Sequence, residues 1–404
     1  LDGPASAARH AERQSQMHDL AARVRSLWRS GSGCAAGHEA RPARQPADGP
    51  RLRAVALPDE VLALMSDGDR VEAKRWTVDR ATLRALLDDF AAGRLDVETW
   101  RRDAAPLVEV LTVGLDPTLQ VGTDGSADIV FSLHGMLQDV PLVALPWGDG
   151  WLGASWVPLV QPAEGGDAVG RRWAEDSAPS DGPLVVVDPT RDLPAAAAAV
   201  EDWRRDFPTA RLLSGDSASR EAVVAGLKTA TWLHVDAHGT YDPAFPELSG
   251  LRLADRPLRV VELAEDRAAL DPSLAFVHLS GCQTGRWPIT ADSGAYGLAG
   301  LFSRSGVPWV VASRYDLPDD LAAAFNRRFY AAVADGGGVP EAFRQGLASI
   351  AEMQPPSAWG GLMLLRTGRQ LGRSATRPGQ SGGRSTPPQG ATPNTRSSSA
   401  EEIP

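Results

Sequence analysis

Two short segments place a histidine and a cysteine in matching positions. Residues 233–242, "LHVDAHGTYD", carry His238 before Gly239, and residues 277–286, "VHLSGCQTGR", carry Cys282. Each segment begins as a short apolar strand and ends in small, turn-forming residues. The two side chains are separated by 282 − 238 = 44 residues. Because an imidazole can take the proton of a nearby thiol, the pattern indicates nucleophilic catalysis by cysteine.

Glycines flank both candidate residues. Gly239 follows the histidine, and Gly281 and Gly285 lie on either side of the cysteine. A glycine has no Cβ, so the backbone at these positions can approach a substrate carbonyl closely. We therefore expect the backbone N–H groups of Gly239 and Cys282 to form an oxyanion hole.

Each of these residues also has an ordinary structural interpretation. A lone cysteine at a strand end is usually packed and inert, and a lone histidine is more often structural. The pairing of His238 with Cys282 at the ends of consecutive strands favours catalysis. His234 and His278 lie inside the same strands and are expected in the core. Asp236 either orients His238 or bonds turn amides, and we favour the second role.

The elements that position these residues alternate between strand and helix. Strands are expected at 128–133, 182–189, 231–236, 275–280, 307–313 and 359–366, and helices at 194–206, 217–229, 292–305, 318–334 and 340–352. This alternation predicts an α/β fold with a mainly parallel sheet and helices on both faces. Ligands bind at the carboxyl ends of such strands, where both candidate residues are expected.

Four segments are expected along the chain. Residues 1–50 carry an N-terminal helix and a linker, 51–118 form a helical segment, 119–368 form the α/β domain, and 369–404 form a tail. The tail has almost no aliphatic residue and no aromatic one, so we expect it to be disordered.

Composition excludes several classes of function. The 404-residue chain has a net charge of −10, so direct nucleic acid binding is not expected. No apolar run is long enough to span a membrane. The two cysteines, Cys34 and Cys282, do not form a disulfide framework, which favours a cytoplasmic location. Motifs for a zinc site or a P-loop are absent from the sequence, and no metal or cofactor is expected. The chain begins at Leu1, which indicates a fragment or a processed protein.

Longer stretches resemble the CHAT domain, a caspase-like peptidase domain often found beside tetratricopeptide repeats. The resemblance covers roughly residues 80–366, including "HVDAHGTYD", "VHLSGCQTG" and "GLAGLFSRSGVPWVVASRYDLPDD". It implies a caspase-hemoglobinase fold of clan CD and a dyad that falls on His238 and Cys282. Gly281 departs from the more usual alanine, and Arg314 and Tyr315 alter the segment that commonly contains a tryptophan.

The function implied by this resemblance is a CHAT-type cysteine endopeptidase. It would cleave protein or peptide substrates through a thioester acyl-enzyme, without a metal. An activating protein partner or an upstream repeat module is expected to regulate it. Two alternatives stay open: a non-catalytic interaction module with the same fold, and an enzyme that is silent until a partner reorders its loops.

The segment "SRYDLPDD" is expected at the same sheet edge as Cys282. It carries Arg314, Asp316 and Asp319. Separase-like relatives hold a basic side chain with an acid, and Asp319 matches the family's aspartate. We therefore expect a preference for Arg or Lys before the cut, which Arg314 could neutralise or reverse. In the alternative interpretation, the aspartates only cap the helix that begins near Leu317.

Overall fold

The computed structural model describes residues 50–67, 70–115, 128–161, 182–266, 274–287 and 297–367. The N-terminal helix expected within residues 1–50 and the tail expected at 369–404 lie outside these ranges, apart from residue 50. Among the described residues, no helix is both long enough and apolar enough to cross a membrane.

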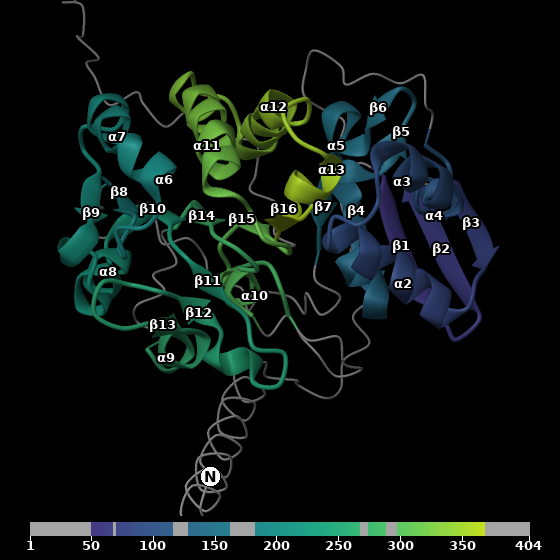
Figure 1. The fold of residues 1–404 in the computed structure, drawn as a ribbon, viewed down its shortest axis with the longest axis horizontal. Helices are drawn as coiled ribbons and strands as arrows, with labels where there is room; N and C mark the ends of the chain where they lie inside the picture. Colours follow the sequence, from purple (N-terminus) through teal and green to yellow (C-terminus); the bar gives the residue numbers. More distant parts are fainter. Residues whose placement is uncertain are drawn as a thin grey trace, which may run out of the picture. The chain divides into compact units, whose positions relative to one another are not determined.

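One large sheet of eleven strands organises the described residues (Figure 1). Its spatial order is β3 (Arg70–Thr77), β2 (Glu60–Asp67), β1 (Arg51–Ala56), β4 (Asp128–His134), β7 (Val157–Val160), β16 (Leu362–Arg366), β15 (Trp309–Ser313), β14 (Phe276–Ser280), β10 (Ala230–Asp236), β8 (Gly182–Val187) and β9 (Arg211–Ser214). Two parallel groups meet at the antiparallel pair of β15 and β16. The expected mainly parallel α/β sheet is confirmed.

Helices cover both faces of this sheet (Figure 1). They are α2 (Arg80–Ala91), α3 (Val97–Asp103), α4 (Ala105–Leu111), α5 (Leu152–Ser155), α6 (Pro194–Ala198), α7 (Val200–Asp206), α8 (Arg220–Leu227), α9 (Val260–Glu265), α10 (Leu298–Arg304), α11 (Asp319–Ala334), α12 (Val339–Ile350) and α13 (Pro356–Trp359). Coverage on both faces explains why every residue of β14 is buried.

Short elements complete the loops. They are the 3₁₀ turns η1 (Gly135–Asp139), η2 (Leu142–Ala144), η3 (Gly215–Ser217) and η4 (Pro246–Leu248), the small sheet of β11 (Gly239–Thr240), β12 (Gly250–Leu251) and β13 (Leu258–Arg259), and the hairpin of β5 (Pro146–Trp147) and β6 (Gly150–Trp151). The small sheet, β9 and the hairpin were not expected from the sequence.

The expectation that residues 51–118 are helical is wrong for the first part of that segment. Residues 51–77 form β1, β2 and β3, and helices begin only at α2. In β2, Val61, Ala63 and Met65 are buried, whereas Leu64 on the other face is 43% exposed. Because both faces of β2 carry apolar side chains, the strand period of two is hidden in the sequence.

Most later elements agree with the sequence. The expected strands correspond to β4, β8, β10, β14, β15 and β16. Ser219, one of two expected caps, begins α8 by accepting a hydrogen bond from the N–H of Ala222 at 3.3 Å. The helix expected at 292–305 is described only as α10, because residues 288–296 lie outside the described ranges.

Candidate active site

The register of β10 and β14 explains the spacing of the histidine and the cysteine. These parallel neighbours pair Asp236 with Ser280, an offset of 280 − 236 = 44 residues. The same offset separates His238 from Cys282. Both residues therefore occupy equivalent positions, two residues beyond the last paired residues, on adjacent loops at one edge of the sheet.

The glycines allow these two loops to touch each other. A Cβ at Gly239 would lie 2.0 Å from the carbonyl oxygen of Cys282, and one at Gly281 would lie 2.3 Å from the carbonyl oxygen of Ala237. These distances are too short for any side chain. The glycines therefore join the histidine loop to the cysteine loop, whereas the expected approach to a substrate carbonyl stays a prediction.

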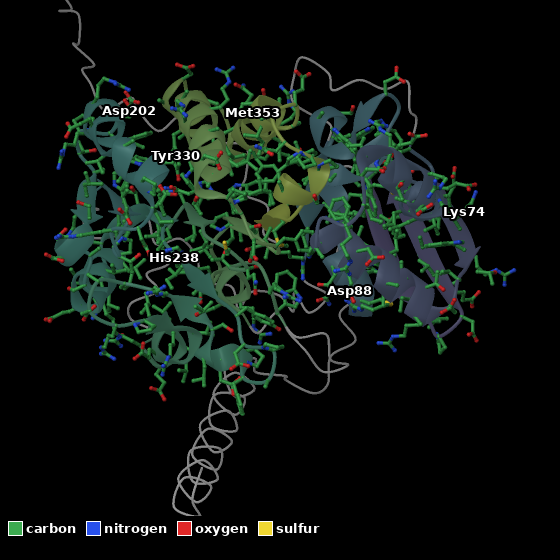
Figure 2. All side chains as sticks on the ribbon, in the orientation of Figure 1. Lys74, Asp88, Asp202, His238, Tyr330 and Met353 are labelled. Carbon is green, nitrogen blue, oxygen red and sulfur yellow. The ribbon has the colours of Figure 1, made fainter. Side chains whose placement is uncertain are left out.

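His238, labelled in Figure 2, contacts a carboxylate that neither motif contains. Its Nε2 lies 2.9 Å from Oδ1 of Asp192, and the imidazole is 32% exposed. Thr190 donates a hydrogen bond to the same carboxylate oxygen. The Thr190 hydroxyl first, and then His238, lower the pKa of Asp192, so this side chain is ionised at neutral pH.

Asp192 is positioned by the turn that follows β8. Asp188 and Arg191 have φ angles of 45° and 59°, values that non-glycine residues seldom adopt. The carboxylate of Asp188 holds this turn by accepting N–H groups of Asp192 and Leu193 at 2.9 and 3.0 Å. Since β8 neighbours β10, the turn brings Asp192 beside His238.

The thiol of Cys282 lies against the loop that follows β15. Its Sγ accepts the N–H of Leu317 at 3.4 Å and lies 3.7 Å from the carbonyl oxygen of Leu317. Burial raises the pKa of the thiol, and the nearby negative charge of Asp316 raises it further. At neutral pH the thiol is therefore protonated.

Gln283, the residue after the cysteine, ties the cysteine loop to the loop that follows β15. Gln283 has a φ of 57°, and its N–H donates to the carbonyl oxygen of Tyr315 at 3.1 Å. Its side-chain amide donates to Asp316 at 2.9 Å. These contacts place the exposed Asp316 beside the cysteine loop.

The other two expected pocket residues are engaged elsewhere. The carboxylate of Asp319 accepts the N–H groups of Ala195 and Ala196 at 2.7 and 3.2 Å, so it caps α6 rather than its own helix. Arg314 is only 5% exposed, and its guanidinium lies 4.1 Å from the ring centroid of Trp287. Neither residue contacts His238 or Cys282 through a hydrogen bond or ion pair among the described residues.

A buried polar network lies beneath the two loops, and we call it the Asp236 cluster. Its members are His234, Asp236, His278, Ser280, Asn326 and Tyr330. Asp236 lies 2.8 Å from His234 Nε2 and accepts the Asn326 amide at 2.8 Å. The hydroxyl of Tyr330 bridges the two histidines. The expected core positions of His234 and His278 are confirmed. Neither role expected for Asp236 is seen, because its side chain points into this network.

The two motifs do not reveal these partners. Asp192, Asn326 and Tyr330 come from a turn and a helix that are far from the two motifs in sequence. A polar residue directly after a buried strand, Asp188 in "VVVDPTRD", is the one signal that points to this turn, and Asp192 lies four residues further on. No group of three or more His, Cys, Asp or Glu side chains suited to a metal ion occurs within the described ranges.

Comparison with solved structures gives the class of fold. A chain in the 3.0 Å crystal structure of the Saccharomyces cerevisiae separase–securin complex is similar, with a TM-score of 0.50 and 7% identity over 79% of this chain. A 2.6 Å structure of that complex matches with a TM-score of 0.37 and 9% identity, covering 86% of this chain and 23% of that one. The first match spans only 30% of the separase-complex chain. The likeness to the first of these chains shows the caspase-hemoglobinase-like fold that the sequence predicts.

The family follows from the sequence itself. The family model of the CHAT domain matches residues 101–367, which is more than half of the 404 residues. The chain belongs to the CHAT domain family. No curated protein matches the chain.

Proposed function

We propose that the chain is a cysteine endopeptidase in which His238 activates Cys282. The observation that carries this proposal is the shared offset of 44 residues, which puts both side chains on touching loops at one sheet edge. The sulfur would bond to the substrate carbonyl carbon, and the peptide C–N bond would break. His238 would take the thiol proton and give it to the leaving amine. Water would then hydrolyse the thioester and restore the thiol.

The protonation state of the thiol defines the part that His238 plays. Burial raises the pKa of Cys282, so a base must remove the proton as the sulfur attacks. The Nε2 atom of His238 contacts Asp192, which leaves Nδ1 to accept this proton. Ionised Asp192 then stabilises the imidazolium and fixes the ring orientation. Asp192 is a positioning residue in this scheme.

Backbone N–H groups supply the remaining chemistry. We assign the oxyanion hole to Gly239 and Cys282, whose backbones lie in direct contact. The loss of one such donor lowers the rate by about 10²–10³ in a well-studied protease. Substitution of Gly239 by any larger residue would separate the two loops and remove this arrangement.

Asp316 is the carboxylate best placed to select a substrate side chain. It is exposed beside the cysteine loop, whereas both oxygens of Asp319 accept α6 amides. We infer that a preference for Arg or Lys before the cut rests on Asp316. Profiling a peptide library with wild-type protein and Asp316→Ala tests this. A preference for acidic residues, or one unchanged by the substitution, would contradict it.

Covalent labelling tests the proposed dyad. A set of peptidyl acyloxymethyl ketones should label the purified chain at Cys282, and Cys282→Ala should abolish both labelling and peptide cleavage. Cys34→Ala removes the other cysteine of the chain and should behave as wild type.

His238→Ala should lower the rate by about 10²-fold or more, the usual contribution of a general base. Asp192→Asn should lower kcat with little change in KM. Cleavage by Cys282→Ala at the wild-type rate would refute the dyad.

A regulated enzyme is the second candidate, and the cysteine loop favours it. The thiol bonds to the N–H of Leu317, and Gln283 is tied to both Tyr315 and Asp316. An activating protein partner or an upstream repeat module would have to move these contacts before catalysis. Labelling of Cys282 that appears only after cell extract is added would favour this candidate. No labelling under either condition would favour a non-catalytic module.

A further inference from the structure

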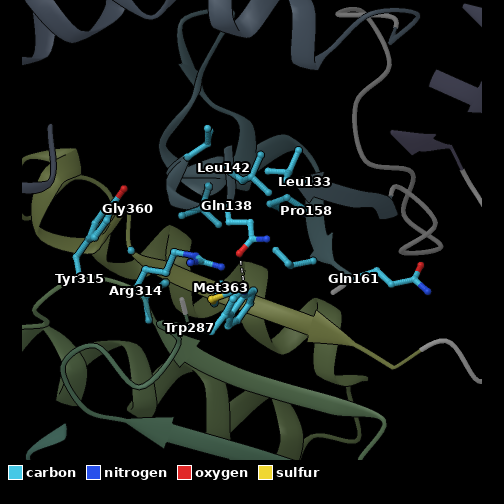
Figure 3. Close-up of a pocket in the computed structure, with 15 residues that line it drawn as sticks. Leu133, Gln138, Leu142, Pro158, Gln161, Trp287, Arg314, Tyr315, Gly360 and Met363 are labelled. Carbon is cyan, nitrogen blue, oxygen red and sulfur yellow. Dashed lines mark hydrogen bonds between the residues drawn. The ribbon is translucent and has the colours of Figure 1, made fainter. Parts of the chain in front are cut away.

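A pocket lies apart from the proposed dyad, between the segment of η1 and η2 and the strands β4, β7 and β16 (Figure 3). It encloses about 510 Å³, counting its open mouth, and it is narrow inside. Leu133, Leu142 and Met363 give it apolar walls. Neither His238 nor Cys282 lines it.

One buried cation projects into this pocket. Figure 3 shows Arg314 extending between Gln138 and Trp287. The guanidinium lies 4.1 Å from the Trp287 ring centroid, and the side chain is 6% exposed. Its Nη1 is 3.5 Å from Oδ1 of Asp139, which is close enough for attraction between the charges. That nitrogen nevertheless has no hydrogen-bond partner among the described residues.

Arg314 shares the carboxylate of Asp139 with a second guanidinium. The other oxygen of Asp139 accepts Nη1 of Arg84 at 2.8 Å, and the same nitrogen lies 3.6 Å from Oδ1 of Asp88. Burial lowers the pKa of Arg314, and the positive charge of Arg286 lowers it further, whereas the charge of Asp139 opposes this shift. A buried guanidinium with one nitrogen left without a hydrogen bond carries an uncompensated desolvation cost. An anion in the pocket would therefore gain both charge neutralisation and the unused donor at Nη1.

The donors of Arg314 and the apolar walls of the pocket favour one kind of anion. A planar guanidinium matches the two oxygens of a carboxylate. A phosphate group matches the same donors, but its higher charge would have to be buried against apolar walls in a narrow space. We propose that this pocket binds a carboxylate carried on a short apolar stem, through Arg314. The carboxylate can come from an acidic side chain of a polypeptide or from a small organic acid.

This site does not depend on the proposed peptidase activity, so binding can be measured directly. Isothermal titration calorimetry of the whole chain would use propionate, N-acetylglutamate N-methylamide and the matching glutamine amide. The glutamate compound should bind about tenfold or more tightly than its neutral isostere, because a charged hydrogen bond distinguishes them. Propionate binding of similar strength identifies a small acid as a sufficient ligand. Binding of the glutamate amide alone identifies an acidic side chain.

Variants assign the binding to Arg314. Arg314→Met should weaken binding of the carboxylates about tenfold or more, and Arg314→Lys should restore part of it. Arg101→Met is the matched control, since Arg101 also stacks on a tryptophan, Trp151, but donates to three backbone carbonyls. It should bind as wild type does. Equal affinity of wild-type protein for the glutamate and glutamine amides would overturn the proposal even if Arg314→Met fails to fold. Undetectable carboxylate binding, or binding unchanged in folded Arg314→Met, would also overturn it.

Discussion

Two buried polar clusters differ in how completely their charges are partnered. In the Asp236 cluster, each oxygen of the carboxylate of Asp236 has a partner at 2.8 Å. In the Arg314 cluster, formed by Arg84, Asp139, Trp287 and Arg314, one nitrogen of the buried guanidinium has no hydrogen bond within the described part of the chain. The first cluster joins β10, β14 and α11 beneath the two candidate loops. The fully partnered carboxylate of Asp236 holds the strand ends in place, although Oδ1 of Asn326 has no hydrogen-bond partner among the described residues. In the Arg314 cluster the unpaired nitrogen belongs to a charged group, and it leaves a donor for a ligand.

The largest effect is expected from Asp236→Ala. This change leaves His234 and the Asn326 amide without their shared acceptor in a fully buried place. We expect a loss of about 3–5 kcal/mol in the free energy of unfolding, because each buried polar group left without its partner costs about 1–3 kcal/mol. Urea denaturation measures it. Asp316→Ala, at an exposed carboxylate, is the control and should change stability little. A loss below about 1 kcal/mol in Asp236→Ala would mean that the network does not hold these strands.

The Asp236 cluster should also make stability depend on pH. Burial, and then the charge of His234, hold the pKa of His278 well below its ordinary value. Below about pH 6.5 His278 is protonated in the unfolded chain but stays neutral in the folded chain. The free energy of unfolding therefore falls as the pH falls. One such proton costs about 1.4 kcal/mol per pH unit.

Unfolding experiments between pH 5 and pH 8 measure this slope (roughly the range in which histidine titrates). His278→Phe removes the titrating group and should flatten the curve by the share that belongs to His278. His234 and Tyr330 are the titratable groups that face His278, so His234→Gln serves as the comparison variant. An unchanged slope in His278→Phe would assign the dependence to other groups.

A smaller effect is expected at the open cluster. Arg314→Met removes a charge that makes no hydrogen bond through Nη1, and Asp139 keeps its contact with Arg84 at 2.8 Å. No charge is then left without a partner, and the methionine still fills space beside Trp287. We expect a loss of about 1 kcal/mol or less, close to the value of the lost cation–π contact. A loss of about 3 kcal/mol or more would show that Arg314, like Asp236, stabilises the folded state through its buried contacts.

The parts of the fold that the sequence predicts well are those with one dominant local signal. The Val-rich β8 and the capped helix α8 are examples, and the paired motifs place His238 and Cys282 on neighbouring loops because the sheet register preserves their spacing. The failure at β2 has a local cause too. Leu62 and Leu64 make its second face apolar, so alternation cannot be seen without the structure.

The partners of the site residues could not be predicted, because they depend on contacts between distant segments. Asp192 meets His238 across 46 residues, and Asn326 meets Asp236 across 90. The sequence likewise places Arg314 in a loop at the sheet edge but cannot show that its guanidinium is buried over Trp287. Register and burial, rather than residue type, decide these contacts.

The smallest effect is expected at Asp316. It measures how far the charge of this carboxylate alters the pKa of Cys282. Burial is the main cause that raises the pKa of Cys282, and the negative charge of Asp316 is a lesser one. Asp316→Asn removes this charge but keeps an oxygen that can accept the Gln283 amide. The thiolate should become easier to form, so the pKa of the thiol should fall, and only slightly because the exposed carboxylate is screened by water. The rate of alkylation by iodoacetamide as a function of pH measures this pKa in a Cys34→Ala background, where Cys282 is the one remaining thiol.

Asp316→Glu keeps the charge and should match the parent. Since salt screens exposed charges, the difference between parent and Asp316→Asn should shrink at about 1 M NaCl. A difference that persists at high salt would mean that the substitution moves the loop at Leu317 rather than the charge.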